Sequence, residues 1–320
     1  MTHAATRGTR SVSCGPVSAI LLEGRSTADA IGAELRQLIE KLAARRVRPG
    51  LGVLLAGDDP ASAVYVRSKT LACDALGIHH ETARLPQSAT TQAVADRVMA
   101  FNRRADIHGV LVQLPLPPQV DAHAILRLVD PVKDVDGFHP ENLGLLVQKQ
   151  PRFVGCTPAG IVELLTRQGV ALAGRRAVVL GRSDIVGKPM ALLLLHADAT
   201  VTICHSRTRD LASLTRDADV LVVAMGKPGF VRPEHVKPGA VVVDVGINRI
   251  EDAARAEVLV EPSRMDSFRR RGHVVVGDVH FSVRDTAGAM TPVPGGVGPL
   301  TIALLMSNTV KAARMRLDAS

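Results

Sequence analysis

Short apolar segments alternate with longer amphipathic segments along most of this 320-residue chain, and this alternation is the strongest constraint on its fold. Alternating strands and helices predict parallel sheets whose strands are joined by crossover helices. In the first half, the pattern predicts helices at 27–46, 60–76 and 91–103, strands at 51–56, 78–85 and 109–113, and a short helix that ends before Pro131. Gly77 is expected to end the helix at 60–76.

The pattern starts again in the second half of the chain. We expect Thr157 to be the N-cap of a helix, with Pro158 at its first position and Gly169 at its end. Strands are expected at 176–180, 200–204, 220–224 and 240–245, and a final helix at 299–316. The length fits about two domains of roughly 150 residues each, with the boundary within 140–156.

The composition narrows the choice of partners. A formal net charge of +8 favours phosphates, polycarboxylates, nucleic acid or an acidic membrane surface. The densest basic block is only Arg269-Arg270-Arg271, and aromatic residues make up 2% of the sequence. Because single-stranded nucleic acid stacks its bases on aromatic side chains, this composition argues against a nucleic-acid partner. The apolar runs are too short to span a bilayer, so we expect no membrane partner.

Cysteine and histidine spacing argues against a metal site. The chain has four scattered cysteines without a C-x-x-C pair: Cys14, Cys73, Cys156 and Cys204. This pattern is typical of a reducing compartment, so we expect a cytoplasmic protein without a disulfide framework. His139, His205 and His280 also lack metal-ligand spacing, and we interpret them as structural. Residues 1–22 contain no acidic residue and vaguely resemble a transit peptide, but we favour a disordered extension.

The only tyrosine, Tyr65, lies four residues before Lys69 on the predicted helix at 60–76. Asp59 is expected to be the N-cap and Pro60 the first helical residue. Positions i and i+4 share a helix face, so the phenol and the ammonium lie together near the helix start. Spacing alone favours an amphipathic surface tyrosine beside a solvated lysine.

The segment after the predicted strand at 176–180 suits an anion. It reads Gly181-Arg182-Ser183-Asp184, and free N–H groups at the start of the next helix can bind a phosphate there. It is not a G-x-G-x-x-G motif, and a tight strand-to-helix turn explains it equally well.

The end of the next strand indicates which dinucleotide such a site would take. After Cys204 the chain reads His205-Ser206-Arg207, and no carboxylate appears until Asp210. A carboxylate would repel a 2′-phosphate, whereas a guanidinium and a hydroxyl would bind it. A dinucleotide site here would therefore prefer NADP over NAD. If the segment does not bind a dinucleotide, we interpret Arg207 as a solvated loop arginine.

Two further polar residues have open interpretations. Gln113 closes a buried strand, where polar side chains often point at ligands, but it also fits a strand-end cap. Asp136 lies before Gly137 in a loop and also fits an Asx-turn. A G-x-S-x-G motif is absent from the sequence, so hydrolysis through an acyl-enzyme is unsupported.

Taken together, these segments resemble the bifunctional methylenetetrahydrofolate dehydrogenase/methenyltetrahydrofolate cyclohydrolase family. The matching stretches lie within about residues 20–315 and are GDDPASAVYVRSK (57–69), GVLVQLPLP (109–117), KDVDGFHP (133–140), CTPAGI (156–161), GRSDIVGKPM (181–190), CHSRT (204–208), VDVGIN (243–248), GDVHF (277–281) and TPVPGGVGP (291–299). One departure is Asp184, which stands where the family often has asparagine and is expected to weaken phosphate binding slightly.

The resemblance implies a two-domain α/β protein with a folate cleft between its domains. Residues 21–150 with 291–320 would form the catalytic folate-binding domain, and 151–290 a Rossmann-like NADP-binding domain with a parallel sheet. The C-terminal helix would pack on the first domain, and residues 1–20 would be a disordered extension. The implied reactions are NADP-dependent oxidation of 5,10-methylenetetrahydrofolate to 5,10-methenyltetrahydrofolate and its hydrolysis to 10-formyltetrahydrofolate. A homodimer acting on polyglutamylated folates is also implied.

The resemblance assigns roles to individual residues. Lys69 would be the catalytic lysine, Gln113 would hydrogen-bond and tune it, Tyr65 would stack on the folate, and Asp136 would hold the pterin. The residues assigned to the cofactor are Gly181, Arg182, Ser183, Ser206, Arg207, Ile247 and Thr157. The other residues assigned to the folate are Leu114, Pro294 and Gly295.

Two competing interpretations remain. A cyclohydrolase that has lost its dehydrogenase activity would fit the first half, but the intact GRS and HSRT segments argue against it. A basic nucleic-acid-binding protein would fit the net charge, but the scattered basic residues and few aromatic residues argue against it.

Overall fold

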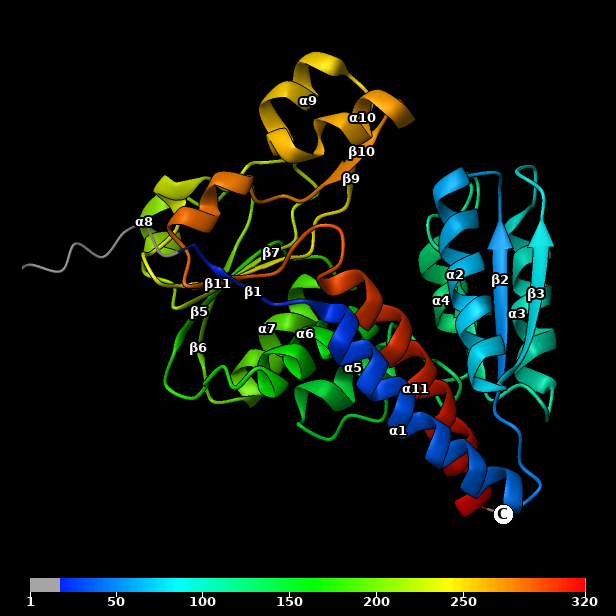
Figure 1. The fold of residues 1–320 in the computed structure, drawn as a ribbon. Helices are drawn as coiled ribbons and strands as arrows, with labels where there is room; N and C mark the ends of the chain where they lie inside the picture. Colours follow the sequence, from blue (N-terminus) through cyan, green and yellow to red (C-terminus); the bar gives the residue numbers. More distant parts are fainter. Residues whose placement is uncertain (1–17, 320) are drawn as a thin grey trace, which may run out of the picture.

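The computed structural model describes residues 18–319, so most of the expected disordered extension, residues 1–17, lies outside the described part. Two α/β units stand side by side, and two long helices, α1 (Gly24–Ala44) and α11 (Val297–Asp318), run between them in contact with each other (Figure 1). Both helices begin slightly before their predicted starts. Within residues 18–319, no helix is long and apolar enough to cross a membrane.

The first unit is built on a three-stranded parallel sheet in the order β3-β2-β4. Its elements are β2 (Gly50–Ala56), α2 (Pro60–Leu76), β3 (His79–Leu85), α3 (Thr91–Arg103), β4 (Gly109–Val112) and α4 (Ala122–Leu128). Side chains of β2 alternate between two aliphatic cores, one shared with α1, α2 and α11 and the other with α3 and α4. Leu305 and Met306 of α11 belong to the first core, so the C-terminal helix packs on the first unit as predicted.

The start and end of α2 follow the predicted local chemistry. Asp59 Oδ2 accepts a hydrogen bond from Ser62 N at 2.8 Å, and Pro60 occupies the first helical position. Gly77 ends the helix with a left-handed φ of 70°. These two signals fix the helix on which Tyr65 and Lys69 lie.

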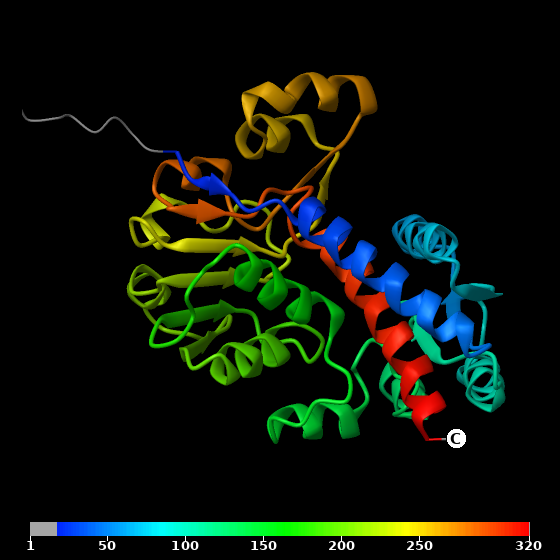
Figure 2. The ribbon, with the colours of Figure 1, turned by 60° about the horizontal axis from the view of Figure 1, so that its bottom comes forward.

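The second unit contains a six-stranded parallel sheet in the order β1-β11-β8-β7-β5-β6. Its strands are β1 (Ile20–Leu21), β5 (Arg176–Leu180), β6 (Thr200–Cys204), β7 (Val220–Val223), β8 (Val241–Asp244) and β11 (Ala289–Met290). The other elements are α5 (Pro140–Val147), α6 (Cys156–Arg167), α7 (Gly187–His196), α8 (Leu211–Arg216), η1 (Pro233–His235) and η3 (Phe281–Asp285). Helices α6 and α7 cover one face, and α8, η1 and η3 cover the other (Figure 2).

Three features of the second unit differ from the prediction. Thr157 is not the N-cap of α6, because that helix begins at Cys156 and Gly155 precedes it. Strands β1 and β11 have two residues each, too few to produce a period-two pattern in the sequence. The prediction also missed a small lobe that stands off the sheet (Figure 1).

That lobe is built between two antiparallel strands. It comprises β9 (Asn248–Ile250), α9 (Ala253–Leu259), η2 (Pro262–Arg264), α10 (Met265–Arg271) and β10 (Val274–Val276). Ile250, Val260 and Phe268 form part of its own small apolar core. Arg264 ties the lobe to the loop before α11 by donating to the Val293 carbonyl at 2.9 Å.

Candidate active site

A cavity of about 370 Å³ lies where loops and helix starts of the two units meet. It receives side chains from α2, α6 and α11, from the segments after β4, β5 and β8, and from the loop before α5. Seven of the predicted site residues line it: Tyr65, Lys69, Gln113, Leu114, Asp136, Thr157 and Ile247. The fold therefore brings together residues that lie far apart in the sequence.

Lys69 and Gln113 form the polar centre of this cavity. Lys69 is only 9% exposed, and its Nζ donates to Gln113 Oε1 at 3.0 Å, as predicted from the family resemblance. Gln113 Nε2 donates to the Leu114 carbonyl at 2.7 Å, which orients the amide so that its oxygen faces the lysine. The lysine is thus held in one position by a side chain that is itself held by the backbone.

The two acids of the loop before α5 have different surroundings. Asp134 is 4% exposed and accepts hydrogen bonds from Phe138 N, His139 N and the Asn142 amide at 2.8 to 3.2 Å. Asp136 instead lines the cavity. Asp134 therefore shapes the loop, and Asp136 is the carboxyl that a ligand can reach.

Burial determines the protonation behaviour around Asp136. It raises the pKa of the Asp136 carboxyl, and the nearby Lys69 ammonium opposes that shift. Burial also raises the pKa of the Cys156 thiol, whose sulfur lies 3.7 Å from Asp136 Oδ1. The phenol of Tyr65, 38% exposed, likewise has its pKa raised by burial, so it stays protonated at neutral pH.

The remaining predicted cofactor residues lie at the carboxyl edge of the six-stranded sheet. Strands β5 and β6 pair side by side, and Gly181 N donates to the Cys204 carbonyl at 2.9 Å. The segments carrying Arg182 and Arg207 therefore leave the sheet from the same edge, and both arginines are exposed. Ser206 is also exposed.

The Gly181 turn requires glycine for two reasons. Its φ is 127°, and a Cβ there would lie 2.3 Å from the Ala224 carbonyl oxygen. Ser183 Oγ accepts from Val186 N and Gly187 N, both at 3.2 Å, which shapes the start of α7. Asp184 pairs with Lys188 at 2.5 Å, so a cation partly balances the unusual carboxylate.

These residues fit an NADP molecule. The edge offers exposed Arg182, Arg207 and Ser206, which suit a phosphate. The first acid after β6, Asp210, accepts from Ser213 N at 3.4 Å and caps α8. No carboxylate therefore stands in the segment 205–209 to bind the ribose hydroxyls that NAD would present there.

Pro294 and Gly295 do not line the cavity of Lys69. Pro294 lines a neighbouring cavity of about 320 Å³ together with Arg264 and Asp244. The loop that carries Pro294 and Gly295 leads directly into α11, whose residues Gly298, Thr301 and Ile302 line the cavity of Lys69.

Sequence reasoning missed several cavity residues. They are Asp59, Ala61, Ser62, Val112, Pro115, Phe138, Cys156, Ile185, Val186, Gly298, Thr301 and Ile302. Most are apolar or small and carry no chemical signal of their own. Membership of matched motifs, as for Ile185 and Val186 in GRSDIVGKPM, is the one signal that could have indicated some of them.

The three histidines interpreted as structural each accept a backbone N–H. His139 Nδ1 accepts from Glu141 N, His205 Nδ1 from Arg207 N and His280 Nδ1 from Ser282 N, at 3.1 to 3.3 Å. Among residues 18–319, no group of three or more His, Cys, Asp or Glu side chains is placed to hold a metal ion.

Fold and site together define a two-domain α/β protein with a dinucleotide-binding type of sheet beside a lysine-containing cavity. Residues 22–136 match the model of the tetrahydrofolate dehydrogenase/cyclohydrolase catalytic domain, and residues 155–317 match that of its NAD(P)-binding domain. The chain belongs to the tetrahydrofolate dehydrogenase/cyclohydrolase family. The predicted family, fold class and enzyme class are thereby confirmed.

Individual relatives support the same conclusion over nearly the whole chain. The bifunctional protein FolD of Solibacter usitatus is 53% identical over 299 residues, which cover 92% of this chain and 98% of that protein. The crystal structure of the FolD dehydrogenase/cyclohydrolase of Campylobacter jejuni is 40% identical, with a TM-score of 0.85 and coverage of 93% and 100%. The Trypanosoma brucei enzyme, solved with NADP and an inhibitor, is 39% identical, with a TM-score of 0.85 and coverage of 94% and 99%.

Proposed function

We propose that this chain oxidises 5,10-methylenetetrahydrofolate to 5,10-methenyltetrahydrofolate with NADP and hydrolyses the product to 10-formyltetrahydrofolate in the same cavity. The observation that carries this proposal is the buried Lys69–Gln113 pair at 3.0 Å, inside a cavity that both units line. Bound NADP would supply a hydride acceptor. The chain's own residues then have to orient the folate and handle protons.

Lys69 is the residue that we assign to the hydrolytic step. Water must add to the methenyl carbon, lose a proton, and a proton must reach the ring nitrogen as the carbon–nitrogen bond breaks. A lysine held beside that carbon can position the water and exchange protons with it. Gln113 Oε1 accepts one ammonium N–H, which aims the remaining donors or the free amine into the cavity.

Tyr65 and Asp136 are assigned to the folate. The partly exposed ring of Tyr65 stands at the cavity wall, where it can stack on the flat pterin. The Asp136 carboxyl can accept parallel hydrogen bonds from the pterin amino group and ring N–H. Leu114, which also lines the cavity, adds apolar contact to the same ligand, and we retain Pro294 and Gly295 as residues that support this wall from the loop before α11.

The cofactor assignment uses the carboxyl edge of the six-stranded sheet. We assign Arg207, Ser206 and Arg182 to the 2′-phosphate, and Gly181 and Ser183 to the turn that the dinucleotide crosses. Thr157 and Ile247 line the cavity itself and are assigned to the part of the cofactor nearest the folate.

The partners and location extend the same proposal. The net charge of +8 suits the additional carboxylates of polyglutamylated folates. Cys73, Cys156 and Cys204 are free and buried, as a cytoplasmic protein would keep them. We also propose that the protein is a homodimer, as the family resemblance implies. Light scattering of the purified protein would measure its molar mass and so test this oligomeric state.

Lys69→Met tests the assignment of the two reactions. It keeps the volume of the side chain and removes its amine, so hydrolysis of methenyltetrahydrofolate should fall at least 100-fold, within the range of general acid–base contributions. Lys311→Met is the matched control, because Lys311 is another partly buried lysine and donates to the Arg152 carbonyl outside the cavity. It should hydrolyse at the wild-type rate.

The readouts separate the competing functions. NADPH absorbance follows the dehydrogenase step, and methenyl absorbance without NADP follows hydrolysis. If the wild-type protein hydrolyses methenyltetrahydrofolate but forms no NADPH, the chain is a cyclohydrolase without dehydrogenase activity. Unchanged hydrolysis in Lys69→Met would remove Lys69 from the assignment.

A further inference from the structure

Two buried aspartates, Asp244 and Asp278, lie at the carboxyl edge of the six-stranded sheet. They are 3% and 0% exposed, and neither was predicted as a site residue. Their hydrogen-bond donors are five backbone N–H groups and one side-chain amide. Because buried carboxylates depend on such bonds, the loops that supply the donors are fixed relative to one another.

Asp278 joins two loops with its two oxygens. Oδ2 accepts from Met225 N at 2.6 Å and Gly226 N at 2.8 Å, in the turn that follows β7. Oδ1 accepts from the Asn248 amide at 2.9 Å, at the start of β9. Charge-assisted bonds of this kind are stronger than those between neutral groups.

Both loops touch residues that we assign to the cofactor. The turn 224–226 contains Ala224, whose carbonyl oxygen lies against Gly181 so closely that any Cβ there would be 2.3 Å away. Ile247, immediately before Asn248, is 53% exposed and lines the cavity of Lys69. The position of Asp278 thus determines where the turn 224–226 and Ile247 lie, and both border the region assigned to the cofactor.

Asp244 holds Asp278 in turn. Its Oδ1 accepts from Asp278 N and Gly246 N, both at 2.9 Å, and its Oδ2 accepts from Val279 N at 2.9 Å. Gly246 and Gly277 leave no space beside the pair, since a Cβ on Gly277 would lie 1.7 Å from Asp244 Oδ2. The two aspartates and the glycines beside them therefore have little freedom to rearrange.

We propose that Asp278 is a positioning residue for NADP, which holds the turn 224–226 against Gly181 and the loop that carries Ile247. This inference rests on the proposed function. Asp278 touches neither folate nor cofactor in this assignment and acts through the two loops.

Asp278→Asn tests the inference in the full chain. The amide keeps the size of the side chain but loses the charge, and one of its two ends can no longer accept a hydrogen bond. We expect the dissociation constant for NADPH, followed by its own fluorescence because the chain has no tryptophan, to rise about tenfold or more. The KM for NADP should rise in parallel, and hydrolysis of methenyltetrahydrofolate without NADP should stay within about twofold of wild type.

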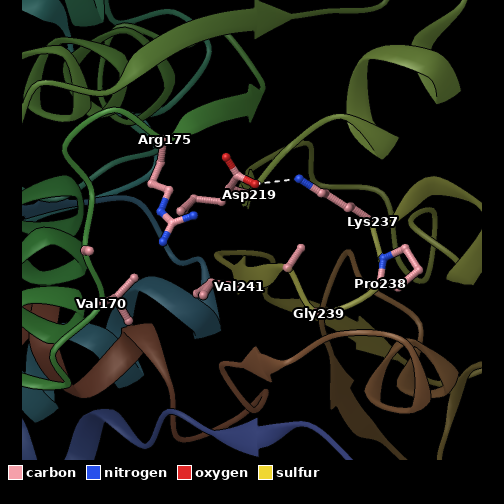
Figure 3. Close-up of a pocket in the computed structure, with 10 residues that line it drawn as sticks. Val170, Arg175, Asp219, Lys237, Pro238, Gly239 and Val241 are labelled. Carbon is pink, nitrogen blue, oxygen red and sulfur yellow. Dashed lines mark hydrogen bonds and ion pairs between the residues drawn. The ribbon is translucent and has the colours of Figure 1, made fainter.

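Asp219→Asn is the matched control at the opposite edge of the same sheet. Figure 3 shows Asp219 beside Lys237. Asp219 also accepts a backbone N–H, that of Arg176 at 3.0 Å, and pairs with Lys237 at 2.6 Å. It precedes β7, whereas the turn held by Asp278 follows that strand. The control should bind NADPH as wild type does.

Each outcome decides the matter. NADPH binding unchanged in Asp278→Asn, or weakened equally in Asp219→Asn, overturns the inference, as does equal loss of both activities. If Asp278→Asn does not fold, Asn248→Ala replaces it, because it removes one of the donors to Asp278 and leaves the carboxylate in place. It should weaken NADPH binding while the protein remains folded, and unchanged binding in this variant would also overturn the inference. Wild-type protein that does not bind NADPH would instead refute the proposed function.

Discussion

The two edges of the six-stranded sheet each border a cavity of nearly the same volume, about 370 Å³ beside the carboxyl edge and about 360 Å³ at the amino edge. The first contains the buried Lys69–Gln113 pair and the Asp136 carboxyl. The second is lined by Arg175, Asp219 and Lys237, and there Asp219 and Lys237 neutralise each other (Figure 3). Cavity size therefore does not distinguish them.

What distinguishes the edges is the direction of the strands. In a parallel sheet, the segments that leave the carboxyl ends lead into helix starts, whose free N–H groups favour anions. Gly181 belongs to such a segment, between β5 and α7, and Gly187 is the first residue of α7. The segments at the amino edge follow helix ends and turn back into strands, so they offer no comparable donors.

Two glycines in the same βα unit give the largest expected contrast. Gly181→Ala should abolish NADP binding and cost several kcal/mol, because the new Cβ would meet the Ala224 carbonyl oxygen at 2.3 Å in a backbone with φ of 127°. Gly174→Ala, before β5, has φ of 72° and no atom within 4 Å, so it should cost only about 1 kcal/mol. Urea unfolding and NADPH titration of both variants measure this difference. Similar stability and similar NADPH binding in the two variants would contradict the prediction.

The pH dependence of stability should have opposite sign at the two edges. Burial, reinforced by the neighbouring Asp278, raises the pKa of Asp244 from 3.8 to about 7. Between these values the folded protein keeps a proton that the unfolded chain has released, so rising pH destabilises the fold. Raising the pH over this interval should lower the free energy of unfolding by an amount on the order of 4 kcal/mol. Asp244→Asn should not show this loss.

Asp219 should behave in the opposite way. The Lys237 ammonium and the Arg176 N–H lower its pKa, so its stabilising contribution is present above the ordinary carboxyl pKa and is lost as pH falls through the folded value. Urea unfolding of wild type, Asp244→Asn and Asp219→Asn from about pH 2 to pH 8 compares the two, because the contribution of Asp219 is lost only below its ordinary carboxyl pKa. Parallel curves for all three proteins would contradict both signs.

Arginine substitutions give the smallest contrast. Arg207→Ala should raise the KM for NADP by about tenfold to 100-fold, the equivalent of about 1.5–3 kcal/mol for a charge-assisted contact, and leave the use of NAD nearly unchanged. Arg175→Ala, in the cavity at the amino edge, should leave both values unchanged. Steady-state kinetics with each cofactor is the measurement, and equal losses with NADP and NAD would contradict the 2′-phosphate assignment.

The sequence predicts most of this fold where local chemistry is strong. The bounds of α2, α3, β5 and β6 agree with the prediction because side-chain caps, the glycine stop of α2 and short runs of apolar and β-branched residues define them. It fails at β1 and β11, which are too short to carry a period, and at the lobe between β9 and β10, whose helices have seven residues each. At Thr157 it mistook a residue of the first helical turn for a cap.

The sequence by itself determined the family, the paired units of strands and helices, and the absence of an acid after β6, since continuous segments of the chain carry each of these. The family resemblance also selected Asp136 for the ligand. Only the tertiary structure showed that Asp134 shapes the loop before α5 and that Asp278 holds the turn 224–226. For Asp278, the outcome depends on which N–H groups from distant parts of the chain packing brings within about 3 Å of a carboxylate. Sequence spacing carries no information on that distance.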